Sequence, residues 1–339
     1  MRDKTEKMLR ILDLYVRMYS GKVIRKDEEA ERFGVDERSI QRDIEDIREF
    51  LSNRELGIPG ENGTVIYDRK EKGFVLNANK GDSLNNNDIL AVCKILLESR
   101  AFPKKKMDNI LDVLIKGCVP KDSMKLVSDL ISNEKYHYIP ASNSSGINNR
   151  IWEMGWEINA QNLLELTYQK AGETGEYVKS IVEPLAIVFS DFYFYLIANK
   201  TEKNERGRYE KIYEYPAVYR IDRIVDYAEI GEKFRINYSN RFQEGEFRKR
   251  IQFMYQGELQ RIRFKYTGHN TEAILDRLPT AKIISKDDGR LMIEAEVYGK
   301  GILMWLLSQG SDVEVVSPAS LRKEMKNRLE QMLSLYADK

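Results

Sequence analysis

The chain has 339 residues, of which 42% are hydrophobic and 32% charged, and its formal net charge is +1. This composition excludes a disulfide-rich secreted scaffold and a chain that is basic throughout, and the length predicts two or three domains. We find no signal peptide, no apolar run long enough to cross a bilayer and no cluster of His and Cys for zinc. Because only two cysteines occur, we expect a cytoplasmic protein. We expect no metal or other cofactor and no membrane partner.

Residues 4–19 predict an amphipathic helix, and residues 26–33 predict a second helix that ends at Gly34. The apolar residues of the first helix recur on one side of it: Leu9, Leu12, Val16 and Tyr19. Asp36 is a suitable N-cap for a third helix over residues 37–51.

The third helix has two different faces. Its apolar residues recur at steps of four, three and four and must be buried: Ile40, Ile44, Ile47 and Leu51. The opposite face carries side chains of the kinds that reach phosphates and base edges in a DNA major groove: Arg38, Ser39, Gln41 and Arg42. The alternative is a solvated charged face, with Arg42 bracing the neighbouring Asp43.

After the third helix, TVIYDRKEKGFVLN predicts two strands joined by a polar turn. A hairpin directly after three helices is typical of the wing of a winged helix. Arg69, Lys70 and Lys72 at its tip would contact the DNA backbone, although a plain solvated turn is the alternative. Residues 1–78 contain 16 Lys and Arg and 17 Asp and Glu, so we expect modest non-specific affinity.

The rest of the chain predicts three further parts. Residues 81–146 are mainly helical and form a linker, with apolar stripes that Pro103 and Pro120 punctuate. Residues 147–232 contain four to five short strands rich in β-branched and aromatic residues, which predict a small β-barrel. Residues 233–339 predict the order βαββαβ and a final helix, as in a ferredoxin-like sandwich. The predicted fold class is therefore α+β with several domains, the first being residues 1–80.

Two side-chain assignments in the last part can be tested. Trp305 in ILMWLL is predicted to lie in the core. The final helix is predicted to start at Pro318 and to bury one face: Leu321, Met325, Leu329, Met332 and Tyr336.

Several motifs follow one another in a characteristic order. They are VDERSIQRDI at 35–44, LELTY ending at Tyr168, Val182-Glu183-Pro184, Phe194-Tyr195-Leu196, the segment Tyr219–Ile224, and WLLSQGSDVEVVSPASLR near the end. In this order they resemble the bacterial transcription regulators that combine a DeoR-like winged helix, a WYL domain and a C-terminal WCX extension. The first position of the Trp-Tyr-Leu triplet departs from the family name, because Phe194 lacks the indole N–H donor.

This resemblance implies an Sm-like barrel that senses a nucleotide or nucleic-acid ligand through an arginine-containing pocket and controls the attached winged helix. Carried over by position, the ligand-binding residues are Tyr168, Lys179, Tyr195, Arg220 and Arg223, with Lys179 matched by neighbourhood alone. On a regular strand, Arg220 and Arg223 would lie on opposite faces. The alternative is that Arg223 is a structural partner of Asp222 or Glu183.

We therefore interpret the chain as a ligand-responsive, sequence-specific DNA-binding transcriptional regulator. Its expected partners are a double-stranded DNA operator, a nucleotide or single-stranded nucleic-acid effector and a second copy, because two recognition helices one DNA turn apart read a near-palindrome. The alternative is an accessory protein that binds RNA or single-stranded DNA through the barrel without operator binding. The sequence shows no phosphate loop, nucleophile elbow or metal cluster, so we do not expect an enzyme.

Overall fold

The structure is a computed structural model. It describes residues 2–52, 63–78, 84–142, 147–170, 175–235, 241–287 and 289–336. The chain divides into two compact units, Met1–Ala91 with Leu114–Val127 and Val92–Val113 with Ser128–Lys339. The predicted domain boundaries at residues 80 and 146 lie outside the described residues. No helix in the described part of the chain is both long and apolar enough to span a membrane.

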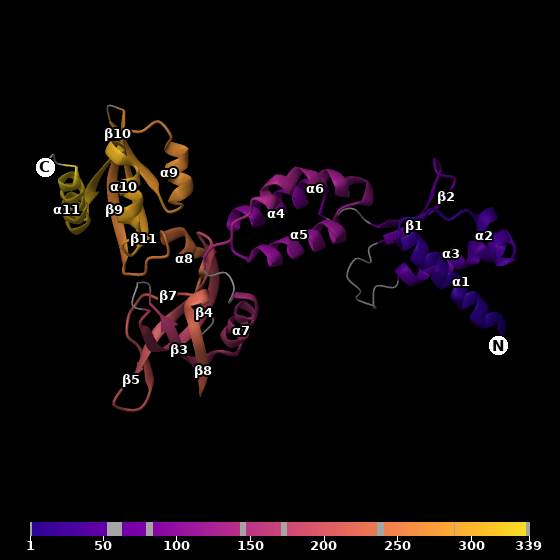
Figure 1. Ribbon diagram of the computed structural model, residues 1–339, viewed down its shortest axis with the longest axis horizontal. Helices are drawn as coiled ribbons and strands as arrows, with labels where there is room; N and C mark the ends of the chain where they lie inside the picture. Colours follow the sequence, from indigo (N-terminus) through magenta and orange to yellow (C-terminus); the bar gives the residue numbers. More distant parts are fainter. Residues whose placement is uncertain are drawn as a thin grey trace. The chain divides into compact units, whose positions relative to one another are not determined.

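The first unit begins with three helices and a hairpin (Figure 1). In chain order these elements are α1 (Arg2–Tyr19), α2 (Lys26–Phe33), α3 (Glu37–Ser52), β1 (Gly63–Asp68) and β2 (Gly73–Ala78). The two strands pair antiparallel, from Gly63 opposite Ala78 to Asp68 opposite Gly73. As predicted, Ile40, Ile44 and Ile47 of α3 are buried, and Leu51 packs against the same core.

Helix α1 packs on this core with a different face from the apolar face that was predicted from its sequence. Leu14 and Met18 are buried, whereas Leu9, Leu12, Val16 and Tyr19 are exposed by 51–70%. Two apolar stripes therefore run along one short helix. Periodicity alone could not tell which stripe packs against α3, because both have helical spacing.

Three helices follow, as predicted for the linker: α4 (Asn86–Ser99), α5 (Lys104–Cys118) and α6 (Lys121–Tyr136). Next comes a helix where strands were predicted, α7 (Ile147–Ala160). Its inward side carries Ile151, Met154 and Ile158, which pack on the sheet that follows. That spacing of three and four is helical, so the prediction that the strand pattern begins at residue 147 was wrong.

The strands after α7 form an antiparallel sheet with the order β6-β5-β4-β3-β8, and β7 pairs with β5. They are β3 (Asn162–Gln169), β4 (Tyr177–Ser190), β5 (Tyr193–Lys203), β6 (Tyr209–Lys211), β7 (Ala217–Arg220) and β8 (Ile224–Lys233). A 3₁₀ turn, Ile221–Arg223, separates β7 from β8. The predicted barrel is not seen as a closed barrel among the described strands.

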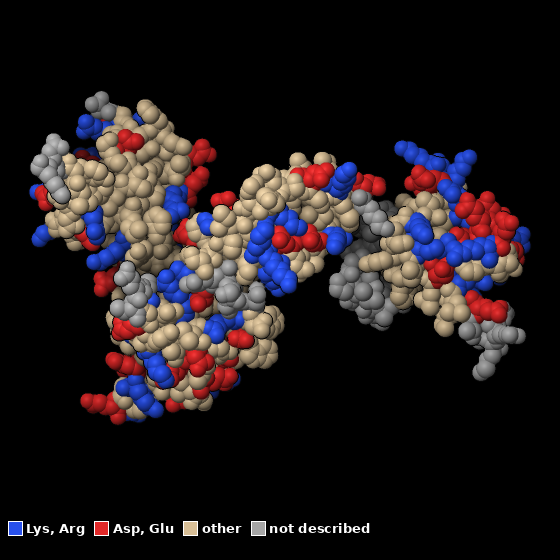
Figure 2. Space-filling model, in the orientation of Figure 1, with Lys and Arg blue, Asp and Glu red and all other residues tan. Residues whose placement is uncertain are grey.

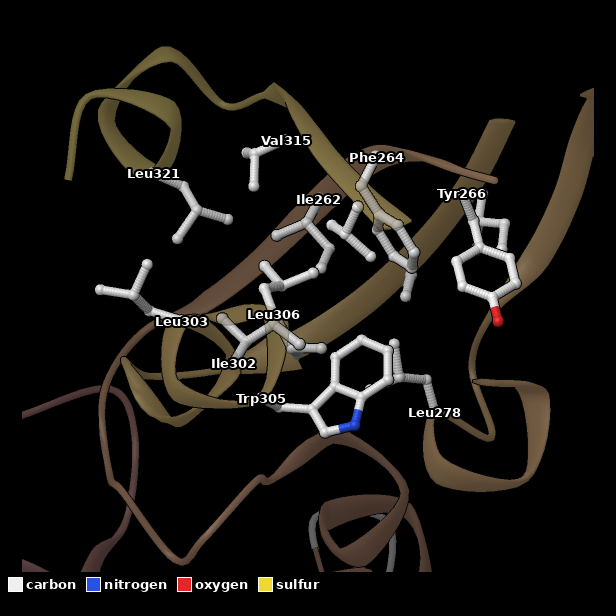
Figure 3. Packing of buried hydrophobic residues seen from close by; sticks show 14 of the residues in the cluster. Ile262, Phe264, Tyr266, Leu278, Ile302, Leu303, Trp305, Leu306, Val315 and Leu321 are labelled. Carbon is white, nitrogen blue, oxygen red and sulfur yellow. The ribbon is translucent and has the colours of Figure 1, made fainter. Parts of the chain in front are cut away.

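The last part has a four-stranded antiparallel sheet with the order β10-β11-β9-β12. Its elements are α8 (Glu244–Arg250), β9 (Leu259–Tyr266), α9 (Thr271–Arg277), β10 (Lys282–Asp287), β11 (Arg290–Tyr298), α10 (Gly301–Ser308), β12 (Val313–Ser317) and α11 (Ala319–Leu335). Figure 3 shows its core, in which Trp305 lies among the aliphatic side chains of α10 and the sheet. The prediction for Trp305 is confirmed, since it is 6% exposed.

The final helix buries less than predicted. Leu321 and Met325 are buried, but Leu329, Met332 and Tyr336 are exposed by 48%, 43% and 83%. The helix therefore packs on its own domain only through its first turns. A periodic apolar face shows that a helix can pack, but it does not show how much of the helix reaches a neighbour.

Candidate nucleic-acid interface and ligand site

Helix α3 starts at a side-chain cap, as predicted. The Asp36 carboxylate accepts a hydrogen bond from the backbone N–H of Ser39 at 2.6 Å. This bond is the main reason why the pKa of Asp36 is lowered. Arg38 and Arg42 are exposed on the first turns after the cap. Among the described residues, no hydrogen bond or ion pair engages either guanidinium, so both are open to a ligand.

The opposite flank of α3 is fixed to α1. The Asp43 carboxylate is fully buried and meets the Arg10 Nε at 2.5 Å. Asp43 is therefore braced by Arg10, and not by Arg42 as the alternative interpretation proposed. Gln41 lies on the exposed side, where its amide donates to Glu45 at 3.1 Å. The rigid contact with α1 leaves the two arginines free while it orients the helix that carries them.

The turn of the hairpin carries the predicted basic residues. Arg69, Lys70 and Lys72 are exposed, and Figure 2 shows Lys and Arg side chains gathered at this tip. The Asp68 carboxylate shapes the turn by accepting the backbone N–H of Lys70 at 2.7 Å. Directly after the turn, a Cβ on Gly73 would lie 2.9 Å from the Ile24 carbonyl oxygen, so only glycine allows this close approach.

The structure brings together three of the five predicted ligand-binding residues: Tyr195 pairs with Arg220, and the Tyr168 hydroxyl accepts a hydrogen bond from the Arg220 backbone N–H at 3.4 Å. Tyr168 lies on the inner side of the sheet, with its ring centroid 5.2 Å from that of Tyr219. Tyr195 pairs with Arg220 across β5 and β7 and packs with Phe247 of α8 on the other side. Burial raises the pKa of Tyr195 to about 12, and the nearby Arg220 charge opposes that rise.

Arg220 is held from two directions. Its guanidinium carbon lies 3.4 Å from the centroid of the Tyr193 ring, and its Nε and Nη2 donate to Asp222 at 3.1 and 2.6 Å. Burial opposes the charge on Arg220, but the Asp222 carboxylate outweighs it and raises the pKa of Arg220. A ligand at Arg220 would therefore have to displace, or share, the Asp222 carboxylate.

Arg223 has neither of the carboxylate partners that the alternative interpretation gave it. It lies in the 3₁₀ turn after β7, where the alternation of a regular strand does not apply. Asp222 is bound by Arg220, and Glu183 accepts a hydrogen bond from Asn199 at 2.8 Å. Within the described part of the chain, no hydrogen bond or ion pair engages the Arg223 side chain. It is half-buried and is the open cation of this segment.

Lys179 lies opposite Thr167 in the sheet, one residue from the position that pairs with Tyr168. It is exposed and pairs with Glu165 at 2.7 Å, and this hydrogen bond raises the pKa of Lys179. The Tyr168 side chain points to the other face of the sheet, where it packs with Tyr219. The Lys179 ammonium group is therefore held by Glu165 on the outer face of the sheet.

The sequence interpretation missed an aromatic turn between β4 and β5. Asp191 and Phe192 form its tip with φ of +44° and +77°, and a positive φ at a phenylalanine is uncommon. Arg100 of the linker lies over the Phe192 ring at 5.1 Å, and the Phe194 ring lies 6.0 Å from that of Phe102. The run Phe192-Tyr193-Phe194 was the available signal. This run contacts the linker through Phe192 and Phe194, and its middle residue, Tyr193, stacks on Arg220.

Two hollows lie near these residues. A groove of about 620 Å³ beside α4 and α6 is lined by Arg100 and Tyr138 among others. A second cavity, of about 420 Å³, opens between α7 and the middle of β4, and none of the predicted ligand-binding residues lines it. Its lining residues are Gly155, Ile158, Asn159, Gln161, Pro184, Leu185, Phe234, Arg241 and Phe242.

Two family models match this chain: a WYL domain at residues 158–229 and a WCX domain at residues 258–333. The chain contains a WYL domain and a WCX domain. The two matches cover the six-stranded sheet and the four-stranded sheet, and neither extends to the three helices and hairpin at the start of the chain. The resemblance noted from the motifs is thereby supported for the second half of the chain.

Two solved structures are distantly similar. Proteasome accessory factor B/C (PafBC) of Arthrobacter aurescens is 15% identical with a TM-score of 0.33, over 93% of this chain and 46% of that chain. A CRISPR Cas-related protein is 16% identical with a TM-score of 0.36, over 76% of this chain and 75% of that chain. The chain thus spans less than half the length of the PafBC chain. No curated protein matches it. At these scores neither likeness bears on function.

Proposed function

We propose that this protein is a ligand-responsive transcriptional regulator that binds a duplex DNA operator as a homodimer. The observation that carries the proposal is the open pair Arg38 and Arg42 on the rigidly anchored helix α3, beside a hairpin with a basic tip. We interpret these elements as a winged helix of the DeoR-like kind. Their occurrence in one chain with WYL and WCX domains supports a nucleic-acid-binding regulator and not an isolated basic surface.

The WYL domain is the proposed sensor of a nucleotide or single-stranded nucleic acid. We interpret its sheet as an Sm-like barrel, and the WCX sheet as a ferredoxin-like sandwich. Arg223 is the favoured phosphate-binding residue, because its guanidinium is open whereas that of Arg220 is occupied by Asp222. Arg220 and Tyr193 would respond to the ligand through the aromatic turn, which contacts the linker at Arg100.

The first test is a pulldown of fragmented host DNA with the full-length protein, followed by sequencing. We expect enrichment of a near-palindromic duplex site. On that site, Arg42→Ala should weaken binding and lower the salt dependence of the affinity by about one phosphate contact. Lys105→Ala removes the same charge from an exposed position on α5 and is the matched control. Equal affinity of the two variants would remove Arg42 from the DNA interface.

The second test concerns the effector. With an operator in hand, nucleotides and short single strands can be screened for their effect on operator affinity. Arg223→Ala should keep the basal operator affinity and lose the response, whereas Lys179→Ala should keep both. A normal response of Arg223→Ala would place the effector elsewhere, with the 420 Å³ cavity as the next position to test.

One observation favours a second candidate function. Residues 1–78 are nearly neutral, with 16 basic and 17 acidic residues, which is unusual for a duplex-binding domain. An accessory protein that holds RNA or single-stranded DNA through the WYL domain would need no basic N-terminal domain. Retention of single strands in the pulldown, without an enriched duplex site, would favour this function over operator binding.

A further inference from the structure

Helix α1 exposes an apolar face that its own fold does not use. Five side chains form this face, and each is more than half exposed: Met8 (57%), Leu9 (59%), Leu12 (51%), Val16 (61%) and Tyr19 (70%). The other side of the same helix, with Leu14 and Met18, supplies the packing against α3. The exposed face is therefore not required for folding, and we name it the α1 stripe.

The spacing of the α1 stripe indicates the kind of surface that it fits. Leu9, Leu12, Val16 and Tyr19 follow one another at steps of three, four and three. These are the a and d positions of a heptad, which give a narrow seam that packs against another helix with the same spacing. A face that lies against a sheet or in a broad groove is usually wider.

Charge around the α1 stripe argues for a like partner. The stripe contains no charged residue, and Asp13 at its edge is already bound by Arg17 at 2.8 Å and lies 3.8 Å from Arg32. Two copies could therefore approach without burying an unpaired carboxylate. A membrane surface would instead require free basic residues along the stripe, but Arg10 and Arg17 are engaged by carboxylates of their own domain.

We propose that the α1 stripe pairs with the α1 stripe of a second copy of this chain, so that two α1 helices form the seam of a homodimer. The pairing is self-complementary, as a two-fold interface requires. Five side chains, each a little over half exposed, offer roughly 500 Å², compared with about 800 Å² per partner in a standard interface. The seam alone therefore gives a reversible, concentration-dependent dimer. The seam itself does not depend on the proposed function. Only its role, to present two copies of α3 to one operator, rests on that function.

Sedimentation of the full-length protein without DNA tests the seam. We expect dimer formation to rise with concentration, and Val16→Glu to weaken association by about a hundredfold, because each copy would then bury an unpaired carboxylate in an apolar seam. Val113→Glu is the matched control, since Val113 on α5 is 60% exposed and Val16 is 61% exposed. Circular dichroism should show that both variants keep their helices, because neither side chain is in the core.

A crosslinking experiment separates this seam from any other dimer contact. Of the two native cysteines, Cys93 is buried and Cys118 is exposed, so Cys118→Ser removes the competing thiol. In that background, Val16→Cys should form a disulfide-linked dimer under mild oxidation, whereas Val113→Cys should not. A protein that stays monomeric at every concentration, or a dimer that Val16→Glu leaves intact and Val16→Cys does not crosslink, would overturn the inference. A Val16-dependent dimer that binds no duplex would uphold the seam while the proposed operator function fails.

Discussion

The buried ion pair between α1 and α3 gives a prediction whose size can be worked out from the structure. The Asp43 side chain is fully buried and that of Arg10 is 12% exposed, with Nε and Oδ2 2.5 Å apart. The second carboxylate oxygen of Asp43 has no hydrogen-bond partner among the described residues. Arg10→Ala would therefore leave a buried carboxylate without its cation, which costs about 3–5 kcal/mol.

A second ion pair between the same two helices is the control. Lys7 and Asp46 lie 2.8 Å apart, but their side chains are 47% and 45% exposed. A pair in this setting contributes about 0–1 kcal/mol because water screens it. Lys7→Ala thus removes the same charge from the same helix, three residues from Arg10, and should have little effect on stability.

Hydrogen exchange of the full-length protein, followed by mass spectrometry on peptides of α1 and α3, measures this difference without unfolding the other domains. Arg10→Ala should speed exchange in these helices by roughly a hundredfold to several thousandfold, and Lys7→Ala by less than about tenfold. Arg10→Met combined with Asp43→Leu should recover most of the protection, since an apolar pair can replace a buried ion pair. Equal exchange in the two single variants would refute the reasoning.

Three further predictions can be checked independently. The pKa of Asp36 is lower in the folded protein than its ordinary value of 3.8, so the Asp36 cap stabilises α3 above pH 3.8, and this stabilisation is lost as the pH falls through the lower folded value. Asp36→Ala should abolish this acid-dependent loss of α3, which hydrogen exchange across pH 2–5 would show. Lys179→Ala should leave thermal unfolding nearly unchanged, because its pair with Glu165 is exposed, and a large fall in melting temperature would contradict this. Gly301→Ala should destabilise the WCX domain by about 1–3 kcal/mol in a urea titration, because the new Cβ would collide with the Gln252 carbonyl oxygen, whereas unchanged stability would show that this backbone can yield.

The sequence predicted the first part of the fold well because its signals are local. The cap at Asp36, the turn at Gly34 and the buried isoleucines of α3 each depend on neighbours within one helical turn. It missed α7 because the strand pattern was expected from residue 147 on, although the inward residues Ile151, Met154 and Ile158 have helical spacing. Trp152 and Trp156, on the outside of this helix, are exposed by more than 60%.

The candidate ligand site was harder to predict because it depends on where a strand stops being regular. Arg220 and Arg223 were expected on opposite faces, but the 3₁₀ turn begins at Ile221, so strand alternation ends between them. The sequence named Arg223 as the possible partner of Asp222, and the structure gives that role to Arg220. No periodic pattern distinguishes these two assignments, since both arginines lie within two residues of Asp222.

The aromatic turn explains how one short segment can serve both the WYL sheet and the linker. Consecutive residues alternate in direction, so Tyr193 meets Arg220 while Phe192 and Phe194 meet Arg100 and Phe102. A ligand that drew Arg220 away from Asp222 would also release the Tyr193 ring, and that ring is covalently flanked by the two residues that hold the linker. Phe194, at the position that names the domain, thus packs on Phe102 of the linker and on Phe189 of β4. Under the proposed function, the ligand contact expected of the triplet would therefore fall to the neighbours of Phe194, Tyr193 and Tyr195.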